Sequence, residues 1–143
     1  PREERRTAGV TVKLLSEADI ACVIQAVNTE DTGFDIYLGS GGAPEGVLAA
    51  AALRCIGGQM QGKLILDTPD KRARAREMGI TDPNRIYDVS ELAAGDVLFS
   101  ATGITDGSLV EGVKLRRHWV ETNTVVMRSW SQTTRWIKAR HAR

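Results

Sequence analysis

The feature that most constrains this chain is a glycine-rich loop at residues 39–46, which stands between an apolar segment at 34–38 and a helix-forming segment at 47–56. Glycines allow positive φ and let a ligand approach the backbone closely. The first turn of a helix presents unpaired N–H groups and a partial positive charge. A strand, this loop and a helix in that order therefore predict a seat for a phosphate group.

Pro44 and Glu45 open the predicted helix. Pro44 suits the first helical position, where no backbone N–H is missed. Glu45 then falls on the first turn, and its carboxylate stands at the rim of the phosphate seat, so a cation would have to lie between the two anions. A simpler interpretation stays open from the loop alone: the glycines make only a tight turn, and Glu45 only complements the helix dipole.

Composition indicates an ordinary globular domain. At 143 residues, with 42% apolar and 26% charged residues, the chain suits one compact α/β domain spanning residues 1–143. A net charge of +1 gives little reason to expect a nucleic acid or a membrane surface as partner. No apolar run approaches the roughly 20 residues of a membrane span, and the charged residues 1–6 are unlike a signal peptide, so we expect a cytoplasmic protein.

The two cysteines predict reduced thiols. Cys22 and Cys55 lie in apolar helical segments and form no Cys-x-x-Cys pair. Buried free thiols are therefore expected in place of a disulfide or a metal site.

Strand-like and helix-like segments alternate along the first hundred or so residues. Strands are expected at 10–15, 34–38, 63–66, 86–89 and 96–100. Helices are expected to begin at Ser16 and Pro44, and a charged surface helix is expected at 70–78. Such alternation calls for right-handed crossovers and a largely parallel core. The expected fold class is α/β, a layered mixed sheet flanked by helices.

Apolar residues recur at helical spacing in the first two helices and predict their buried faces. The first face consists of Ile20, Val23, Ile24 and Val27. The second consists of Val47, Leu48, Ala51, Ala52 and Cys55. The second helix is expected to stop at Gly57 and Gly58.

The last thirty or so residues change character and predict antiparallel strands joined by polar turns. They hold all three tryptophans, Trp119, Trp130 and Trp136, among several arginines and lysines. This combination could bind single-stranded nucleic acid by stacking and charge. A hairpin with one packed and one solvated face is the commoner origin of such a pattern, and the nearly neutral total charge favours it.

Polar clusters follow three of the expected strands, at 16–19, 40–45 and 101–106. Ligands gather at the carboxyl ends of parallel strands, so we expect Asp19 and Glu45 to face one cleft. Their carboxylates are the ligands that Mg²⁺ and Mn²⁺ prefer, although two carboxylates do not complete a metal cage. His118 and His141 are expected as surface or packing residues and not as ligands.

Three motifs stand in order along the chain. They are Gly-Gly-Ala-Pro-Glu-Gly-Val-Leu at 41–48, Gly-Gly-Gln-Met-Gln-Gly-Lys-Leu at 57–64 and Phe-Ser-Ala-Thr-Gly-Ile-Thr-Asp-Gly at 99–107. Together they resemble the C-terminal half of class II fructose-1,6-bisphosphatases, some of which also hydrolyse sedoheptulose-1,7-bisphosphate. The resemblance runs from about Val10 to His141, and it implies a Mn²⁺- or Mg²⁺-dependent phosphatase with the layered fold of the lithium-sensitive sugar phosphatases.

The resemblance also implies roles for particular residues. Glu45 matches a metal-binding glutamate of the family, and Gly42 matches a glycine that binds substrate. The family's Asp-Gly-Asp triplet, which contacts the sugar, corresponds here to Glu17, Ala18 and Asp19. Asp19 is retained, whereas Glu17 is longer than aspartate and Ala18 replaces glycine.

Enzymes of this family are about twice as long as this chain. The resemblance implies that their other metal carboxylates and their water-activating residues belong to an N-terminal half, and the given chain is expected to correspond to the C-terminal half alone. The resemblance implies that the complete enzyme, a homo-oligomer, attacks the 1-phosphate with a metal-activated water, in gluconeogenesis or the Calvin cycle. The expected partners of this chain are the sugar bisphosphate and the N-terminal half, and the chain alone is expected to be inactive.

Two other functions stay open on the residues. Gly39 and Gly41 after a strand, with Asp67 at the end of a later one, favour a Rossmann-type nucleotide-binding module, but Pro44 stands where its third glycine belongs. The other alternative is a non-catalytic assembly module. Melting curves separate them: bisphosphate with Mn²⁺ should stabilise a phosphatase, NAD or NADP a nucleotide-binding module, and neither ligand an assembly module.

Overall fold

The computed structural model describes Thr11, residues 20–27 and residues 32–143. The order of elements is α2 (Ile20–Gln25), α4 (Ala43–Ile56), β1 (Gln61–Lys63), α5 (Pro69–Glu77), β2 (Ile86–Asp88), α6 (Val89–Leu92), β3 (Leu98–Thr102), β4 (Lys114–Leu115), β5 (Trp119–Arg128) and β6 (Thr133–Ala142). Apart from Thr11, the strand expected at 10–15 lies outside the described residues, and so do Ser16, Glu17, Ala18 and Asp19.

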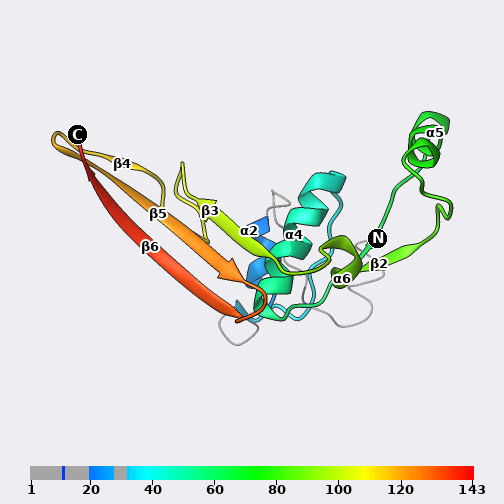
Figure 1. Ribbon diagram of the computed structural model, residues 1–143, viewed down its shortest axis with the longest axis horizontal. Helices are drawn as coiled ribbons and strands as arrows, with labels where there is room; N and C mark the ends of the chain where they lie inside the picture. Colours follow the sequence, from blue (N-terminus) through cyan, green and yellow to red (C-terminus); the bar gives the residue numbers. More distant parts are fainter. Residues whose placement is uncertain (1–10, 12–19, 28–31) are drawn as a thin grey trace.

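The main sheet is built around β5. Along one edge, β5 pairs with β6 over its whole length, from Trp119 opposite Ala142 to Arg128 opposite Thr133. Along the other edge, β3 pairs with residues 124–128 and β4 with residues 120–121. We call residues 124–128 with 133–137 the inner half of the sheet, and residues 119–123 with 138–142 the outer half. The outer half extends away from the helices (Figure 1).

Every strand pairing in the described residues is antiparallel, so the expected largely parallel core is wrong for this part of the chain. The strand expected at 34–38 is absent. Ile36 and Leu38 are 74% and 63% exposed there. A strand exists only where a neighbour completes its hydrogen-bond ladder, and no described strand pairs with this segment. The fold class holds in its coarser form: antiparallel sheets flanked by helices in a mixed α/β chain.

The small sheet consists of β1 and β2, with Gly62 opposite Tyr87, and α5 lies between them in sequence. The strands expected at 63–66, 86–89 and 96–100 are all present, displaced by up to about three residues. The expected charged helix is α5, where the Thr68 hydroxyl accepts a hydrogen bond from the Lys71 N–H. In the described part of the chain, no helix has both the length and the apolar character that crossing a membrane requires.

Helix α4 confirms the second expected helix and ends at Gly57, which adopts the left-handed conformation with φ 75°. Its buried face differs from the expected one. Val47 and Leu48 are 44% and 48% exposed. The buried residues of α4 are Ala49, Ala50, Ala52, Leu53 and Cys55. Apolar residues surround most of this helix, so periodicity does not single out one side, and packing against α2, α6 and the sheet selects it.

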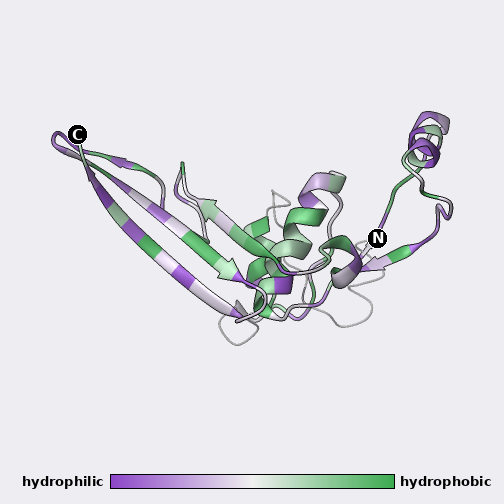
Figure 2. Cartoon of the chain, in the orientation of Figure 1, coloured by the Kyte–Doolittle hydropathy of each residue, from purple (hydrophilic) through white to green (hydrophobic). Residues whose placement is uncertain are grey.

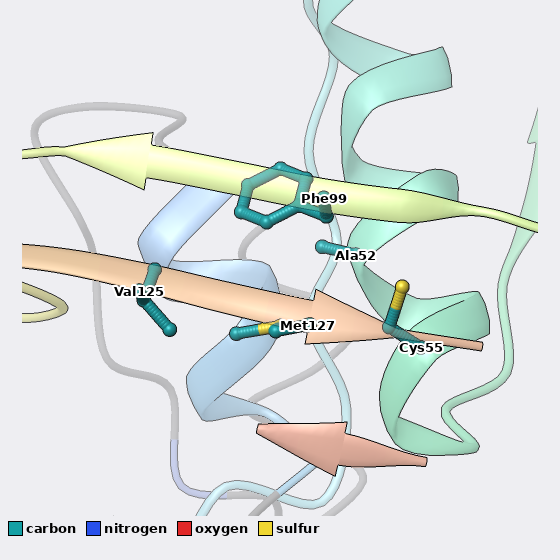
Figure 3. Packing of buried hydrophobic residues seen from close by; sticks show 5 residues of the cluster. All are labelled: Ala52, Cys55, Phe99, Val125 and Met127. Carbon is teal, nitrogen blue, oxygen red and sulfur yellow. The ribbon is translucent and has the colours of Figure 1, made fainter. Parts of the chain in front are cut away.

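The core lies between α4 and the inner half of the sheet. Ala52 and Cys55 of α4 meet Phe99 of β3 and Val125 and Met127 of β5 (Figure 3). Ile20 and Ile24, two of the four residues of the expected face of α2, pack against the same cluster, whereas the buried residue of α2 is Ala21. Hydrophobic residues concentrate at this junction, whereas hydrophilic residues are frequent in the outer half of the sheet (Figure 2).

Both cysteines are free thiols. Cys55 is buried, as expected, while Cys22 is only half-buried. Burial raises the pKa of the Cys55 thiol and outweighs the opposite effect of a backbone hydrogen bond at Phe99.

Candidate functional site

The candidate site is the N-terminal end of α4. Gly42 is the N-cap residue, with φ −68° and ψ 155°, and Pro44 and Glu45 follow in the first turn. The Gly42 carbonyl accepts the first intrahelical hydrogen bond from the Gly46 N–H, at 3.1 Å. The N–H groups that precede Gly46 have no intrahelical acceptor, and no side chain of the described residues caps them. They therefore favour an anion in front of the helix.

Gly42 and Glu45 are brought together at this end. The Glu45 side chain is exposed and turns back over Gly42, so that a Cβ added at position 42 would lie 3.2 Å from Glu45 Cδ and nearer still to Oε2. The φ of Gly42 is open to any residue, so backbone conformation does not require glycine here, and the atoms that a Cβ would meet belong to the flexible Glu45 side chain. A side chain at position 42 would displace the carboxylate. Both residues were predicted site residues: Glu45 from its place on the first helical turn, and Gly42 from the family resemblance.

An exposed carboxylate beside unpaired N–H groups can serve two kinds of ligand. Its oxygens suit a hard cation such as Mg²⁺ or Mn²⁺, while the N–H groups suit phosphate. In the described residues, no three or more His, Cys, Asp or Glu side chains gather as a metal site would require. A metal ion held by Glu45 would therefore need further ligands from water, a substrate phosphate or other parts of the protein.

The loop after β3 borders a second feature, a pocket of about 250 Å³. Its lining consists of Ile20, Ala21, Phe99, Ala101, Thr105, Gly107, Ser108, Leu109 and Val110. Ile20 and Ala21 follow the predicted triplet Glu17–Ala18–Asp19 directly in the sequence, but the triplet itself lies outside the described residues. Neither Gly42 nor Glu45 lines this pocket, so it does not join the clusters at 40–45 and 101–106. Asp19 lies outside the described residues, and its expected place in one cleft with Glu45 stays a prediction.

Asp106 stabilises the loop after β3 through a hydrogen bond. Its Oδ1 accepts a hydrogen bond from the Gly112 N–H at 2.9 Å. The loop crosses itself closely: a Cβ at Gly112 would lie 2.7 Å from the Thr105 carbonyl carbon, so glycine is required there. In the polar cluster at 101–106, Asp106 thus has a structural role within the loop.

The surroundings of Gly39 and Asp67 do not favour a nucleotide-binding module. Within the described residues, no strand precedes Gly39. Asp67 stands four residues beyond the end of β1 and forms an ion pair with Lys71 at 2.7 Å, and the hydrogen bond from Lys71 holds the pKa of Asp67 below its usual value. Both side chains are exposed, so the pair is an ordinary surface contact between the segment before α5 and its first turn.

The aromatic and basic residues near the C-terminus form the expected hairpin of β5 and β6. The Arg140 guanidinium lies 4.3 Å from the Trp119 ring centroid, and the Arg128 guanidinium lies 4.9 Å from that of Trp130. These contacts stack cations on aromatic rings within the chain. His118 and His141 are exposed, as expected.

A charged cluster in the outer half of the sheet was not predicted. Glu121 of β5 is only 4% exposed, and its carboxylate lies 2.9 Å from Lys138 Nζ and 3.4 Å from Arg140 Nη2, both on β6. The hydrogen bond from Lys138, reinforced by the charges of both cations, holds the pKa of Glu121 below its usual value against the opposing effect of burial. Sequence alone gave no signal, because the cluster depends on the register that sets Arg140 opposite Glu121.

Comparisons with known proteins cover nearly all of this chain. The family model described as bacterial fructose-1,6-bisphosphatase, glpX-encoded, matches residues 3–141. Among similar proteins are those of Synechococcus elongatus, 42% identical over 97% of this chain, and Crocosphaera subtropica, 41% identical over 97%, both named D-fructose 1,6-bisphosphatase class 2/sedoheptulose 1,7-bisphosphatase. A Trichodesmium erythraeum protein of the same name is 39% identical over 96%. The chain spans 44% of the length of each of these three relatives.

Proposed function

The chain belongs to the bacterial fructose-1,6-bisphosphatase family, and from this premise we propose that it supplies part of the substrate and metal site of a sugar-bisphosphate phosphatase. The proposed reaction of the complete enzyme is hydrolysis of the 1-phosphate of fructose-1,6-bisphosphate, in gluconeogenesis or the Calvin cycle. The names of the relatives support sedoheptulose-1,7-bisphosphate as a further substrate.

One observation carries the proposal: the Glu45 carboxylate lies over Gly42 at the start of α4. In the proposed site Glu45 holds one Mn²⁺ or Mg²⁺ ion, and Gly42 keeps the space in which the carboxylate and a phosphate can approach the helix start. When bound, such an ion neutralises phosphoryl charge and lowers the pKa of a bound water. We assign Glu17, Ala18 and Asp19 to the sugar, whose hydroxyls would donate hydrogen bonds to the carboxylates.

The remaining metal ligands would come from an N-terminal part of the kind that the longer relatives possess. Exposed apolar side chains are available near the candidate site to contact such a part: Ile36 and Leu38 precede the glycine loop, and Val47 and Leu48 follow it. Because one carboxylate cannot hold and activate a catalytic metal cluster, we expect the 143-residue chain alone to release no phosphate above background. EDTA-sensitive turnover by the purified chain would contradict this division of the site.

The experiment that tests the proposal compares Glu45→Gln with Glu77→Gln, a matched change at an exposed glutamate of α5. Glu45→Gln keeps the size of the side chain but removes the anionic ligand. In the complete enzyme, we expect Glu45→Gln to need more Mn²⁺ for half-maximal phosphate release and to lower the maximal rate. Glu77→Gln should leave both unchanged.

Melting curves without metal separate a binding role from a structural one. If Glu45 only complements the helix dipole, its loss costs about 0.3–1 kcal/mol of stability and leaves turnover intact. If Glu45→Gln releases phosphate as fast as the wild type at every Mn²⁺ concentration, Glu45 is not a metal ligand. Bisphosphate with Mn²⁺ should raise the melting temperature of the complete enzyme, whereas stabilisation by NAD or NADP would favour the nucleotide-binding alternative.

A further inference from the structure

A further pocket, of about 270 Å³, lies at the C-terminal end of α4. Its lining consists of Arg54, Asp96, Ser129, Trp130 and Gln132. Arg54 belongs to the last turn of α4, Asp96 precedes β3, and residues 129–132 form the turn between β5 and β6, which lies beside this end of the helix (Figure 1). Helix α4 has 14 residues and is therefore about 20 Å long, so the pocket is remote from Gly42 and Glu45 at its other end.

Arg54 is a half-buried cation without a counter-charge. Its Nε is buried and has no hydrogen-bond partner in the described residues, and Nη2 donates a long hydrogen bond of 3.4 Å to the Gly95 carbonyl. Arg54 takes part in none of the ion pairs of the described residues. Donors on its terminal nitrogens therefore remain for a ligand, and a partly buried charge without a partner favours an anion close to it.

Asp96 brings the opposite charge to the same pocket. Its side chain is exposed and, like that of Arg54, takes part in no ion pair within the described part of the chain. The two side chains thus do not pair with each other, although both line the pocket. An anion there would meet the carboxylate of Asp96, and a cation would meet the guanidinium of Arg54. A ligand that carries both charges can pair with both side chains.

Gln132 lines the pocket at a cost to the backbone. It has a φ of 46°, in the region that favours glycine, and is the one non-glycine residue with positive φ among those described. A glycine in this turn would relieve the strain but would remove the amide group from the pocket. Ser129 adds a donor, since its Oγ accepts a hydrogen bond from the Val97 N–H at 2.8 Å and its own hydrogen has no acceptor in the described residues.

We propose that this pocket binds a small zwitterion of the α-amino acid class. Arg54 pairs with the carboxylate of the ligand, and Asp96 pairs with its ammonium group. The Gln132 amide and the Ser129 hydroxyl donate further hydrogen bonds to the carboxylate, while the exposed ring of Trp130 contacts the aliphatic part. The volume stands just below the usual range of ligand pockets, about 300–1,000 Å³, and limits the ligand to a small molecule.

Isothermal titration calorimetry on the full 143-residue chain, with each of the twenty standard L-amino acids in turn, tests the inference. At least one is expected to bind one-to-one. Its analogues without the amino group or without the carboxylate should bind more weakly by about tenfold or more, because a hydrogen bond to a charged group contributes about that much. Arg54→Gln and Asp96→Asn should weaken binding by the same factor. Arg76→Gln and Asp70→Asn, matched changes at exposed residues of α5, should leave it unchanged.

Gln132→Gly separates a binding role from a structural one. It removes the amide and relieves the positive φ, so the melting temperature should hold or rise while binding weakens. The inference is overturned if none of the amino acids binds, if the analogue without the amino group binds as tightly as the amino acid, or if Asp96→Asn binds as tightly as wild type. Circular dichroism confirms that each variant is folded, and Asp96→Asn and Gln132→Gly carry the test if Arg54→Gln does not fold. Neither metal nor sugar bisphosphate is present, so the outcome is independent of the tests on Glu45.

Discussion

The inner and outer halves of the main sheet bury side chains on the same face by different means. In the inner half, Val125 and Met127 are 0% and 1% exposed beneath α4. The outer half extends beyond the helices (Figure 1). Its buried residue is Glu121, whose carboxylate forms ion pairs with Lys138 and Arg140. Where helix cover stops, the buried position on this face carries a carboxylate that is paired with two basic side chains of the neighbouring strand.

The pair β5 and β6 is therefore stabilised in two ways, by apolar burial in the inner half and by ion pairs in the outer half. Apolar burial is non-directional and involves no group that titrates. The charged cluster depends on register, on protonation and on ionic strength, and breaking it leaves a cation without its partner. The two halves should therefore respond differently to the same class of substitution.

The largest effect is expected in the inner half. Met127→Ala removes a side chain that is 1% exposed and leaves a cavity, so the free energy of unfolding should fall by about 2–5 kcal/mol in urea titrations. Met78→Ala is the matched control, because Met78 is 71% exposed after α5. Equal losses in the two variants would show that the inner half is not the stabilising core.

A smaller effect, dependent on pH, is expected for Glu121→Gln. The pKa of Glu121 is lowered in the folded protein, while an unfolded glutamate titrates near about 4.3. The stability that Glu121 provides is therefore complete above the unfolded value and is lost as pH falls through the lower, folded value. Urea midpoints at pH 7 and pH 3 should differ less in Glu121→Gln than in wild type. An unchanged difference would mean that the cluster contributes nothing to acid sensitivity.

The smallest effects are expected from single lysines, and they sharpen the comparison. Lys138→Met takes a cation from Glu121, whose side chain is 6% exposed, whereas Lys71→Met takes one from Asp67, whose side chain is 60% exposed. The first change should lower the urea midpoint measurably and the second hardly at all, because solvent already screens an exposed pair. Repeating both in high salt should shrink the effect of Lys138→Met. The reverse ranking would contradict the assigned role of burial.

Sequence by itself determined the features that depend on near neighbours in the chain. The start of α4 with Gly42 and Glu45, its end at Gly57, and the hairpin of β5 and β6 were all predictable. Each rests on backbone conformation or hydrogen bonds between residues close in sequence, or on a short polar turn between two strand-forming segments. The family resemblance, carried by short motifs, was confirmed for the same stretch of chain.

Only the tertiary structure decided which surfaces meet. Residues 34–38 have the pattern of a strand, yet Ile36 remains exposed since no described strand pairs with the segment. Val47 of α4 faces solvent while Ala49 is buried, a choice that an almost wholly apolar helix leaves to its neighbours. Glu121 is buried because register places Arg140 opposite it. These outcomes depend on contacts between residues far apart in sequence, whose energies no local pattern contains.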